Sequence, residues 1–376
     1  MKHKTGPMAS RLLAIEAVVL VAVMTTACLP IAGAFACSGA PAAASVRHRL
    51  LPGPLSRAVR PAGSVRPAGP LCRAVARAEV SAGVYTFDAG GSQVFRCSFK
   101  RKPASPGKES DPPLLLVHPV GIGLSSWFWD KFLAEWEGGE VFAPDLIGCG
   151  DSDPWLPAQA GMFVPLDWVR AIEALWAQEI RRKCVVVVQG GLGPVGVQLA
   201  ARQSGGWDGS RAVAGLVLAS PPSFDAMRAG LDSDKVASNW KWLTSPPGQL
   251  SYYLLRSRPF VKFFSDLFLF AGAADPKWLD DACAGATPDA RYPVFAFNAG
   301  LVIAKGFVGE LAALDQRRLP MLVLSGAHDS RSEKREASAA SLGSCRLARL
   351  PGKNVLPWEN PSATAEAIME FIASVQ

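Results

Sequence analysis

The fold is decided by the stretch Cys184-Val-Val-Val-Val188-Gln-Gly190-Gly191-Leu192-Gly193. Four consecutive valines are typical of a strand that is buried on both faces of a parallel sheet. The glycines after them predict a tight turn, and a short helix is expected to run from there through Ala201. Apolar runs at residues 114–117, 214–219 and 321–324 alternate with helical patterns in the same way. The chain is therefore expected to form an α/β fold, in which helices cover both faces of a mostly parallel sheet.

Two further segments extend this expected core. A turn between apolar alternating runs at residues 84–87 and 93–100 predicts a β-hairpin before the first buried strand. Residues 221–319 show aromatic-rich helical patterns and no strand pattern, so we expect a helical cap inserted between core residues 79–220 and 320–376. Such an insertion can act as a lid over a pocket or as a docking surface, and the sequence leaves both open.

Composition and charge exclude several classes of protein. The chain is 49% hydrophobic and 19% charged, which is typical of a globular protein and not of a disordered or fibrous one. The formal net charge is +7, but residues 1–78 carry ten Lys or Arg and one acidic residue, or +9, which leaves −2 for the remainder. A nucleic-acid partner is therefore not expected, because such a binder needs its positive charge on the folded surface.

Cysteine and histidine are arranged in a way that does not favour a metal site. The eight cysteines are scattered, with no Cys-x-x-Cys pair. His118 and His328 are the two histidines that follow residue 78. We therefore expect neither a disulfide scaffold nor a structural zinc site, and no cofactor.

The N-terminal 78 residues resemble two consecutive targeting segments. Residues 1–36 have basic residues before an apolar run and small residues after it, as in a signal peptide, although a retained membrane anchor is the alternative. Residues 37–78 are rich in Ala, Pro, Ser and Arg and contain no Asp or Glu, which is typical of a transit peptide; a linker in a secreted protein is the alternative. Together they resemble the bipartite presequence of secondary plastids, and the junction Gly33-Ala-Phe-Ala36 is similar to the Ala-Phe cleavage signal of red-lineage algae. A plastid location, in the stroma or at the thylakoid, is expected.

Three local motifs resemble the α/β-hydrolase superfamily, of the AB hydrolase-1 type. His118-Pro-Val-Gly121 follows the strand at residues 114–117 and is similar to the His-Gly oxyanion turn of that family. Asp145-Leu-Ile-Gly-Cys-Gly-Asp-Ser-Asp153 is similar to its Asp-x-x-Gly-x-Gly-x-Ser-Asp segment. Gly190-Gly-Leu-Gly193 lies at the position of the nucleophile elbow, Gly-x-Ser-x-Gly. The resemblance covers essentially all of residues 79–376.

The resemblance implies a catalytic triad that is incomplete in this chain. The nucleophile position corresponds to Gly191, which has no side chain that can attack a substrate. The histidine position, seven residues before Pro361, corresponds to Asn354, which does not accept a proton at neutral pH. The position of the orienting acid is still occupied, by Asp329.

The oxyanion hole depends on backbone N–H groups and can survive the loss of a triad. Val120 and Leu192 occupy the positions of its two donors in the family. The sequence also contains four residues that could substitute for missing catalytic groups, although a structural role is expected for each: His118, His328, Ser220 and Cys149. A working enzyme would need two such substitutes at once.

A second motif competes for the same turn. Gly191-Leu-Gly193-Pro-Val-Gly196 has the Gly-x-Gly-x-x-Gly spacing of a dinucleotide-binding fingerprint between a strand and a helix. The acidic residue expected at the end of the next strand is missing, because Leu218-Ala-Ser220 stands there. Close packing of helix and strand is the simpler explanation for Gly196.

Three functions remain open on this sequence. The first is a protein without catalytic activity that binds a hydrophobic small molecule or a thylakoid-associated partner. The second is an active hydrolase of an ester or prenyl-type lipid that uses unconventional residues. The third is dinucleotide binding.

Overall fold

We describe the protein from a computed structural model, which covers residues 79–90, 93–157, 161–203 and 212–375. The signal-peptide and transit-peptide predictions for residues 1–36 and 37–78 lie outside the described residues. Within the described part, no helix is both long enough and apolar enough to cross a membrane.

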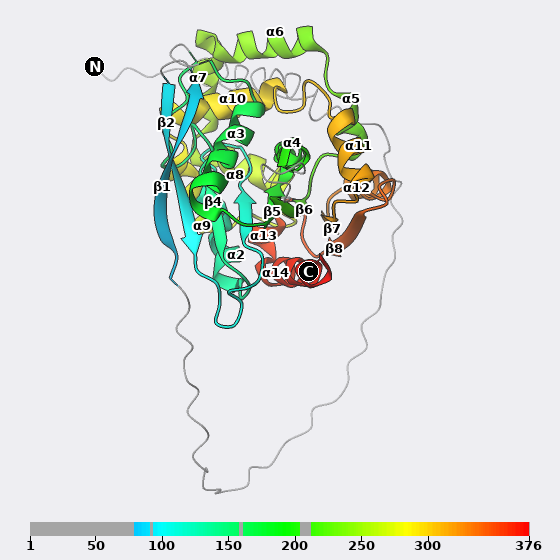
Figure 1. Cartoon of the computed structure of the whole chain (residues 1–376). Coiled ribbons are helices and arrows are strands. Elements are labelled where there is room, and N and C mark those ends of the chain that lie inside the picture. The colour runs from blue at the N-terminus through cyan, green and yellow to red at the C-terminus, as the bar shows by residue number, and fades with distance from the viewer. Residues whose placement is uncertain (1–78, 91–92, 158–160, 204–211, 376) are drawn as a thin grey trace, which may run out of the picture.

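Eight strands form a single sheet in the order β1-β2-β4-β3-β5-β6-β7-β8 (Figure 1). The strands β1 and β2 form the predicted antiparallel hairpin, and β2 also pairs antiparallel with β4. The pairings from β4 through β8 are parallel, which confirms the predicted mostly parallel sheet. The strand bounds are β1 Ser81–Gly90, β2 Gln93–Lys102, β3 Leu114–Val117, β4 Val141–Pro144, β5 Cys184–Gln189, β6 Val213–Ala219, β7 Met321–Gly326 and β8 Cys345–Leu350.

The apolar run of β5 is continuous because the sheet is buried on both faces. Successive side chains of a strand point to opposite faces. Accordingly, Val186 and Val188 pack in one buried cluster and Val185 and Val187 in another. All four valines are fully buried.

Helices cover both faces of the sheet. On one face lie α3, η2 and α4, and on the other lie α2, α13 and α14 with the short helix η1 before α2 (Figure 1). The bounds of these helices are η1 Ser126–Trp129, α2 Asp130–Glu135, α3 Leu166–Leu175, η2 Trp176–Ile180, η3 Gly190–Leu192, α4 Gly193–Gln203, α12 Ser332–Ala339, α13 Leu356–Glu359 and α14 Pro361–Val375.

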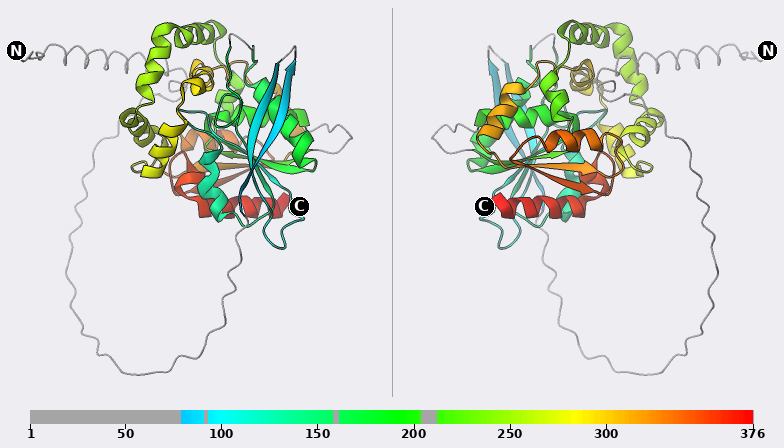
Figure 2. Two further views of the ribbon diagram at one scale, coloured as in Figure 1. Left: turned by 90° about the vertical axis from the view of Figure 1, so that its left-hand side faces the viewer. Right: turned by 90° about the vertical axis from the view of Figure 1, so that its right-hand side faces the viewer.

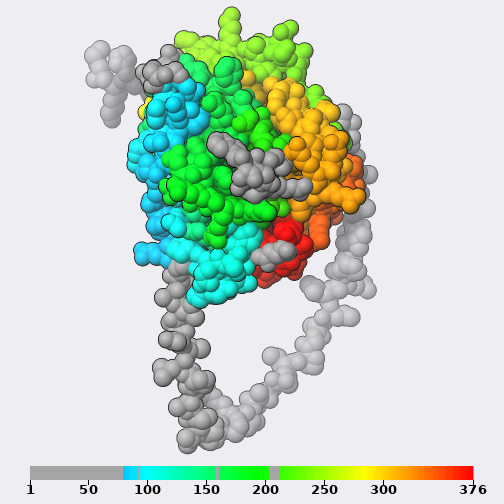
Figure 3. Space-filling model, in the orientation of Figure 1, coloured from blue at the N-terminus to red at the C-terminus, as the bar shows by residue number. Residues whose placement is uncertain are grey.

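A long helical segment lies between β6 and β7. In Figure 3, α6 covers the top of the molecule, and Figure 2 shows the helices that follow it as an arc beside the sheet. The bounds are α5 Phe224–Ala229, α6 Ser233–Thr244, α7 Pro246–Leu255, α8 Arg258–Phe264, η4 Ser265–Leu269, α9 Pro276–Gly285, η5 Pro288–Ala290, α10 Arg291–Ala299 and α11 Val308–Gln316.

The sequence predicts that residues 221–319 form one inserted unit, but the helix α11 packs with the core. Its buried residues Leu311 and Leu314 belong to the same cluster as Val195 and Leu199 of α4. It therefore lies against the layer that covers the sheet. We reserve the name inserted helices for α6 to α10.

The inserted helices contact the loops at the carboxyl ends of the strands. A Cβ atom built on Gly123, after β3, would lie 1.8 Å from the carbonyl oxygen of Ala282 in α9. A Cβ atom on Gly148, after β4, would lie 2.6 Å from Pro293 in α10. Both glycines also have positive φ angles, +69° and +85°, so a side chain at either position would be disfavoured by the backbone conformation as well as by the close contact. These contacts fix the inserted helices over the edge of the sheet where ligands bind in open α/β folds.

Candidate functional site at the end of β5

The turn after β5 has its left-handed residue at Gly190 and not at Gly191. Gly190 follows the last residue of β5 and has a φ angle of +64°, whereas the φ of Gly191 lies outside the left-handed region. A nucleophile elbow holds its nucleophile in such a strained conformation. By this backbone criterion the elbow conformation lies at Gly190, one residue before Gly191, the position that the sequence pattern predicts. The conclusion that the elbow has no side chain is the same for both residues.

The two glycines have very different surroundings. Gly190 is buried, yet a Cβ atom built on it would meet no other atom within 4 Å. A Cβ atom on Gly191 would lie 2.4 Å from the ring of Phe297 in α10. The elbow therefore has enclosed room for a side chain at Gly190, and an inserted helix closes over its neighbour.

The geometry of the turn also changes the expected pair of oxyanion donors. In the short 3-10 helix Gly190–Leu192, the N–H of the C-cap Gly193 donates to the carbonyl of Gly190. The N–H of Gly191 lies in the first turn of this helix and has no partner inside it. With the elbow at Gly190, the residue after the elbow is Gly191, and its N–H takes the donor position that the sequence assigns to Leu192.

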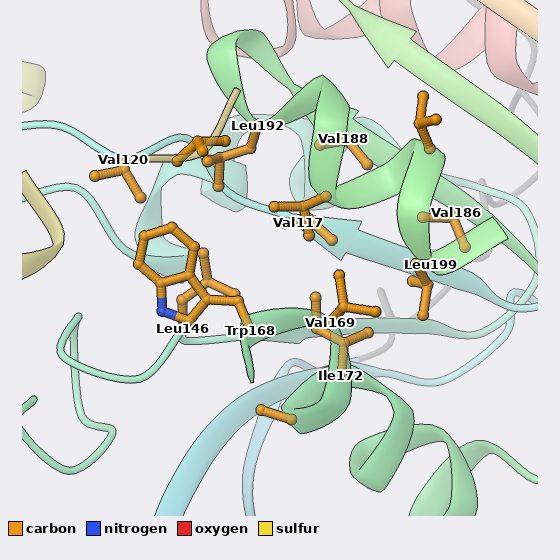
Figure 4. Packing of buried hydrophobic residues seen from close by; sticks show 14 of the residues in the cluster. Val117, Val120, Leu146, Trp168, Val169, Ile172, Val186, Val188, Leu192 and Leu199 are labelled. Atoms are coloured by element: carbon orange, nitrogen blue, oxygen red, sulfur yellow. The ribbon is translucent and has the colours of Figure 1, made fainter. Parts of the chain in front are cut away.

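Val120 retains the properties of the second donor. Its N–H has no acceptor among the residues that the structure describes, and its side chain is buried. Figure 4 shows Val120 and Leu192 in one buried cluster with Val117 of β3 and Val188 of β5. The loop after β3 thus lies in the same apolar region as the turn after β5.

Asn354 lies in the loop after β8, and this loop reaches the end of β5. The side-chain Nε2 of Gln189 donates a hydrogen bond of 2.8 Å to the backbone carbonyl of Asn354. The N–H of Asn354 donates to the carbonyl of Leu269, at the end of η4. The structure therefore brings the predicted histidine position next to the elbow, with an amide in place of an imidazole.

Asp329 is held by two arginines of the following helix region. Its Oδ1 lies 2.9 Å from Nε of Arg331, and its Oδ2 lies 2.8 Å from Nη2 of Arg335. The side chain of Asp329 is 1% exposed and that of Arg335 is 3% exposed. Arg335 also donates through Nε to the carbonyl of Pro221, at 2.7 Å. Asp329 therefore holds Arg335 of α12, which in turn binds the segment that follows β6. The sequence contains no signal for this role.

The charge state of Asp329 follows from these contacts. Burial opposes ionisation of the carboxyl, but the charges and hydrogen bonds of Arg331 and Arg335 outweigh it and hold the pKa below the ordinary value. His328 is exposed, whereas Asp329 is buried. Asp329 is therefore paired with arginine and not with its neighbour His328.

His118 has both ring nitrogens engaged. Its Nε2 accepts the N–H of Leu146 at 3.0 Å, which leaves the proton on Nδ1, 2.8 Å from the carbonyl oxygen of Pro119. Burial lowers the pKa of this imidazole, so the neutral form persists. His118 joins the loops after β3 and β4, and it is not placed to act as a base.

Cys149 and Ser220 differ in their suitability as nucleophiles. Burial, with a smaller contribution from the carboxylate of Asp145, raises the pKa of the Cys149 thiol far above its ordinary value, so the reactive thiolate is disfavoured. Ser220 follows the end of β6, has a φ angle of +49°, and its buried hydroxyl has no hydrogen-bond partner. Gln189 and Ala219 are paired in the sheet, so Ser220 and Gly190 follow neighbouring strand ends.

The Asp145 segment has a structural function. The carboxylate of Asp145 accepts the N–H groups of Ser126, at 2.7 Å, and Asp151, at 3.0 Å. A Cβ atom on Gly150, whose φ is +55°, would lie 2.4 Å from this carboxylate. The pattern of glycines and acids in this motif thus builds a tight loop around one buried carboxylate.

Gly196 is explained by packing between α4 and the sheet. A Cβ atom there would lie 2.5 Å from Val188 and 3.1 Å from Leu216. This close approach accounts for the last glycine of the Gly-x-Gly-x-x-Gly spacing without a nucleotide.

A metal site and a second pocket are the other features that could mark a functional site. In the described ranges, no three His, Cys, Asp or Glu side chains come together in an arrangement that could hold a metal ion. A surface depression of about 580 Å³ lies at the amino ends of the strands, where Pro113, Arg182 and Ala214 contribute to its wall. It is at the opposite edge of the sheet from Gly190.

The sequence of residues 114–367, more than half of the chain, matches the model of the alpha/beta hydrolase family. The chain therefore belongs to this family. No curated protein matches the sequence.

Solved structures support the same fold at low sequence identity. A thermophilic esterase from Thermogutta terrifontis is 20% identical, with a TM-score of 0.56 and coverage of 78% of this chain and 99% of the other. The haloalkane dehalogenase DbeA from Bradyrhizobium elkani is 19% identical, with a TM-score of 0.58 and coverage of 79% and 99%. Likeness at this level shows the fold and does not transfer an activity.

Proposed function

We propose that this protein is an α/β-hydrolase-fold binder without hydrolytic activity, which holds a hydrophobic ligand beneath its inserted helices. The observation that carries the proposal is the buried Gly190, where a Cβ atom would meet no other atom within 4 Å and where the fold normally presents its nucleophile. A binder needs room at this position, whereas a hydrolase needs a side chain there.

The residues at the other two triad positions, Asn354 and Asp329, also support a lack of hydrolytic activity. Asn354 has no group that accepts a proton at neutral pH, so a nucleophile elsewhere in the site would still need a base. Asp329 is committed to Arg331 and Arg335. All three members of a triad are thus missing or engaged elsewhere, and triad removal typically leaves only about 10³ to 10⁴ over the uncatalysed rate.

The surroundings of the site favour an apolar ligand. Several half-buried aromatic side chains of the inserted helices pack against the core cluster that contains Val120 and Leu192, namely Trp240, Trp242, Tyr292 and Phe297. The free N–H groups of Val120 and Gly191 would bind an oxygen of that ligand, since such donors were arranged for an oxyanion. In this proposal the inserted helices act as a cap, and the protein acts in the plastid.

A fluorophosphonate probe and ligand extraction test the proposal together. The protein should not react with the probe, because neither Gly190 nor Asn354 supplies an activated hydroxyl. Organic extraction of protein purified under native conditions should release a hydrophobic compound. A matched variant, Gly191→Leu, should release less of the compound, because the added side chain would overlap the ring of Phe297 and displace the helix α10 that lies over the site. Stoichiometric labelling by the probe would refute the proposal.

Hydrolysis by Ser220 is the second candidate, and one observation favours it. A non-glycine residue with a left-handed backbone and an unpartnered buried hydroxyl is unusual, and such strain gathers at functional sites. The described structure does not offer this serine a base, since both nitrogens of His118 are engaged and His328 is exposed. Probe labelling that disappears in Ser220→Ala would establish this function.

A further inference from the structure

The outer face of the inserted helices carries an unusual concentration of exposed apolar side chains. Twelve large apolar side chains are exposed in the described part of the chain, and six of them fall within residues 250–268. We call these six the cap ridge: Leu250, Tyr253, Leu254, Phe263, Leu267 and Phe268. An apolar group of this kind on a protein surface marks an interaction site.

Their spacing places the members of each helix on one face. In α7, residues 250, 253 and 254 follow the i, i+3, i+4 pattern, while Tyr252 and Leu255 turn inward and are buried. In α8 and η4, residues 263, 267 and 268 lie about one turn apart, while Val261 and Ser265 are buried. Two consecutive helices therefore expose an apolar face and bury the opposite one.

Positive charge accompanies the ridge. Residues 232–268 contain five Lys or Arg against three acidic residues, Asp232, Asp234 and Asp266. Lys235 and Lys241 are exposed on α6, which packs against α7, and the guanidinium of Arg256 lies 4.9 Å from the ring centroid of Tyr253. Arg258 and Lys262 form exposed ion pairs with Asp280 and Asp266. The positive charge of this segment that is left therefore comes from Lys235, Lys241 and Arg256.

We propose that the cap ridge docks the protein on an anionic lipid surface. Helices that lie in a membrane interface combine a face of Leu, Phe or Trp with Lys and Arg beside it, and α6 to η4 have this composition. Each basic residue near an anionic bilayer adds to the attraction between protein and lipid. The members of the ridge are exposed on the helices, so they can enter the acyl boundary without a groove in a partner.

Photocrosslinking from lipid to protein tests the location of the contact in the full chain. The probes are vesicles of phosphatidylcholine, and of phosphatidylcholine with phosphatidylglycerol, each containing a phospholipid with a diazirine on its acyl chain. On the anionic vesicles, mass spectrometry should find crosslinks in residues 246–269 as well as any made by the N-terminal segment. Crosslinks that are absent from residues 246–269 would overturn the proposal.

Two matched triple variants test the side chains. Leu250→Gln/Leu254→Gln/Phe263→Gln should lower the crosslinking yield in residues 246–269 by about tenfold, as expected when three apolar side chains no longer enter the bilayer. Val84→Gln/Val308→Gln/Leu347→Gln changes equally exposed residues away from the ridge and should leave the yield unchanged. Circular dichroism would verify that both variants are folded. Equal effects of the two variants would contradict the proposal.

Electrostatics and self-association provide the remaining tests. Lys235→Gln/Lys241→Gln should lower the yield on anionic vesicles and not on neutral ones, and raising the salt concentration should act in the same direction. If sedimentation shows a dimer that the ridge variant abolishes, while its crosslinking to lipid is unchanged, the ridge binds a second copy and the proposal fails. Ligand extraction from the ridge variant reports separately on the proposed function and should be unaffected.

Discussion

Replacing Asp329 by Asn distinguishes a structural anchor from a catalytic acid. The substitution leaves the shape of the side chain but removes its charge from a site where Asp329 and Arg335 are almost completely buried. Arg335 cannot lose its proton, so the variant contains a buried guanidinium without a counter-ion. Breaking a buried pair in this way typically costs 3 to 5 kcal/mol, and we expect a loss of about 3 to 5 kcal/mol in the free energy of unfolding.

Urea denaturation of the wild type and of two variants measures this effect. The matched control is Asp225→Asn, which removes a carboxylate that is 77% exposed and pairs with Arg228. It should cost no more than about 1 kcal/mol, as is usual for surface ion pairs. A change below about 1 kcal/mol in Asp329→Asn would refute the structural role argued from the arginine contacts. An orienting acid would instead show its effect in turnover, with a fall of about 10⁴ in kcat.

The pH dependence of the same difference provides a second measurement. The folded-state pKa of Asp329 lies below its ordinary value, so the pair contributes stability above the unfolded-state pKa, about 3.9. That contribution is lost as the pH falls through the lower folded-state pKa. The stability gap between wild type and Asp329→Asn should therefore be full at neutral pH and narrow only below about pH 4.

Three other outcomes are expected. Gly191→Ala should destabilise the protein more than Gly190→Ala in thermal unfolding, because the added Cβ atom would overlap the ring of Phe297. Gly190→Ala costs only the positive φ of an alanine, about 1 to 2 kcal/mol. The reverse order would contradict the placement of the elbow. The double variant Gly190→Ser/Asn354→His should hydrolyse p-nitrophenyl acetate slowly, while each single variant stays inactive, since a nucleophile and a base act only together. Turnover by the unmodified protein above that of the double variant would contradict the proposed lack of catalysis. The N-terminus of the native protein should lie within a few residues of Glu79, where the acid-free segment ends, and peptides from residues 40–70 in that protein would show otherwise.

The sequence predicted the architecture because the relevant signals are local. Four valines in β5 are enough to indicate a strand buried on both faces, since a polar residue on either side would be left without water. Part of the Asp145 motif also has a local meaning, because Gly150 and the N–H of Asp151 approach the carboxylate of Asp145 within one loop. Local motifs of this kind identified the hydrolase fold, which the structure confirms.

The sequence also predicts that the elbow and histidine positions lack a nucleophile and a base, because a glycine or an asparagine cannot supply them in any fold. Only the tertiary structure decided which glycine occupies the elbow. Gly190 and Gly191 are identical in chemistry, and they differ in backbone φ and in the distance to Phe297, a residue more than 100 positions away.

The sequence also does not show which side chain the carboxylate of Asp329 binds. Whether a carboxylate orients a base or binds an arginine depends on which side chain the fold brings within about 3 Å. Arg335 lies six residues later on α12, and nothing in that spacing shows that its guanidinium turns back to the end of β7 and to Pro221. The sequence therefore determined the fold and which residue types stand at the triad positions. Long-range packing determined what those residues contact, because contacts between distant segments form only when the chain has folded.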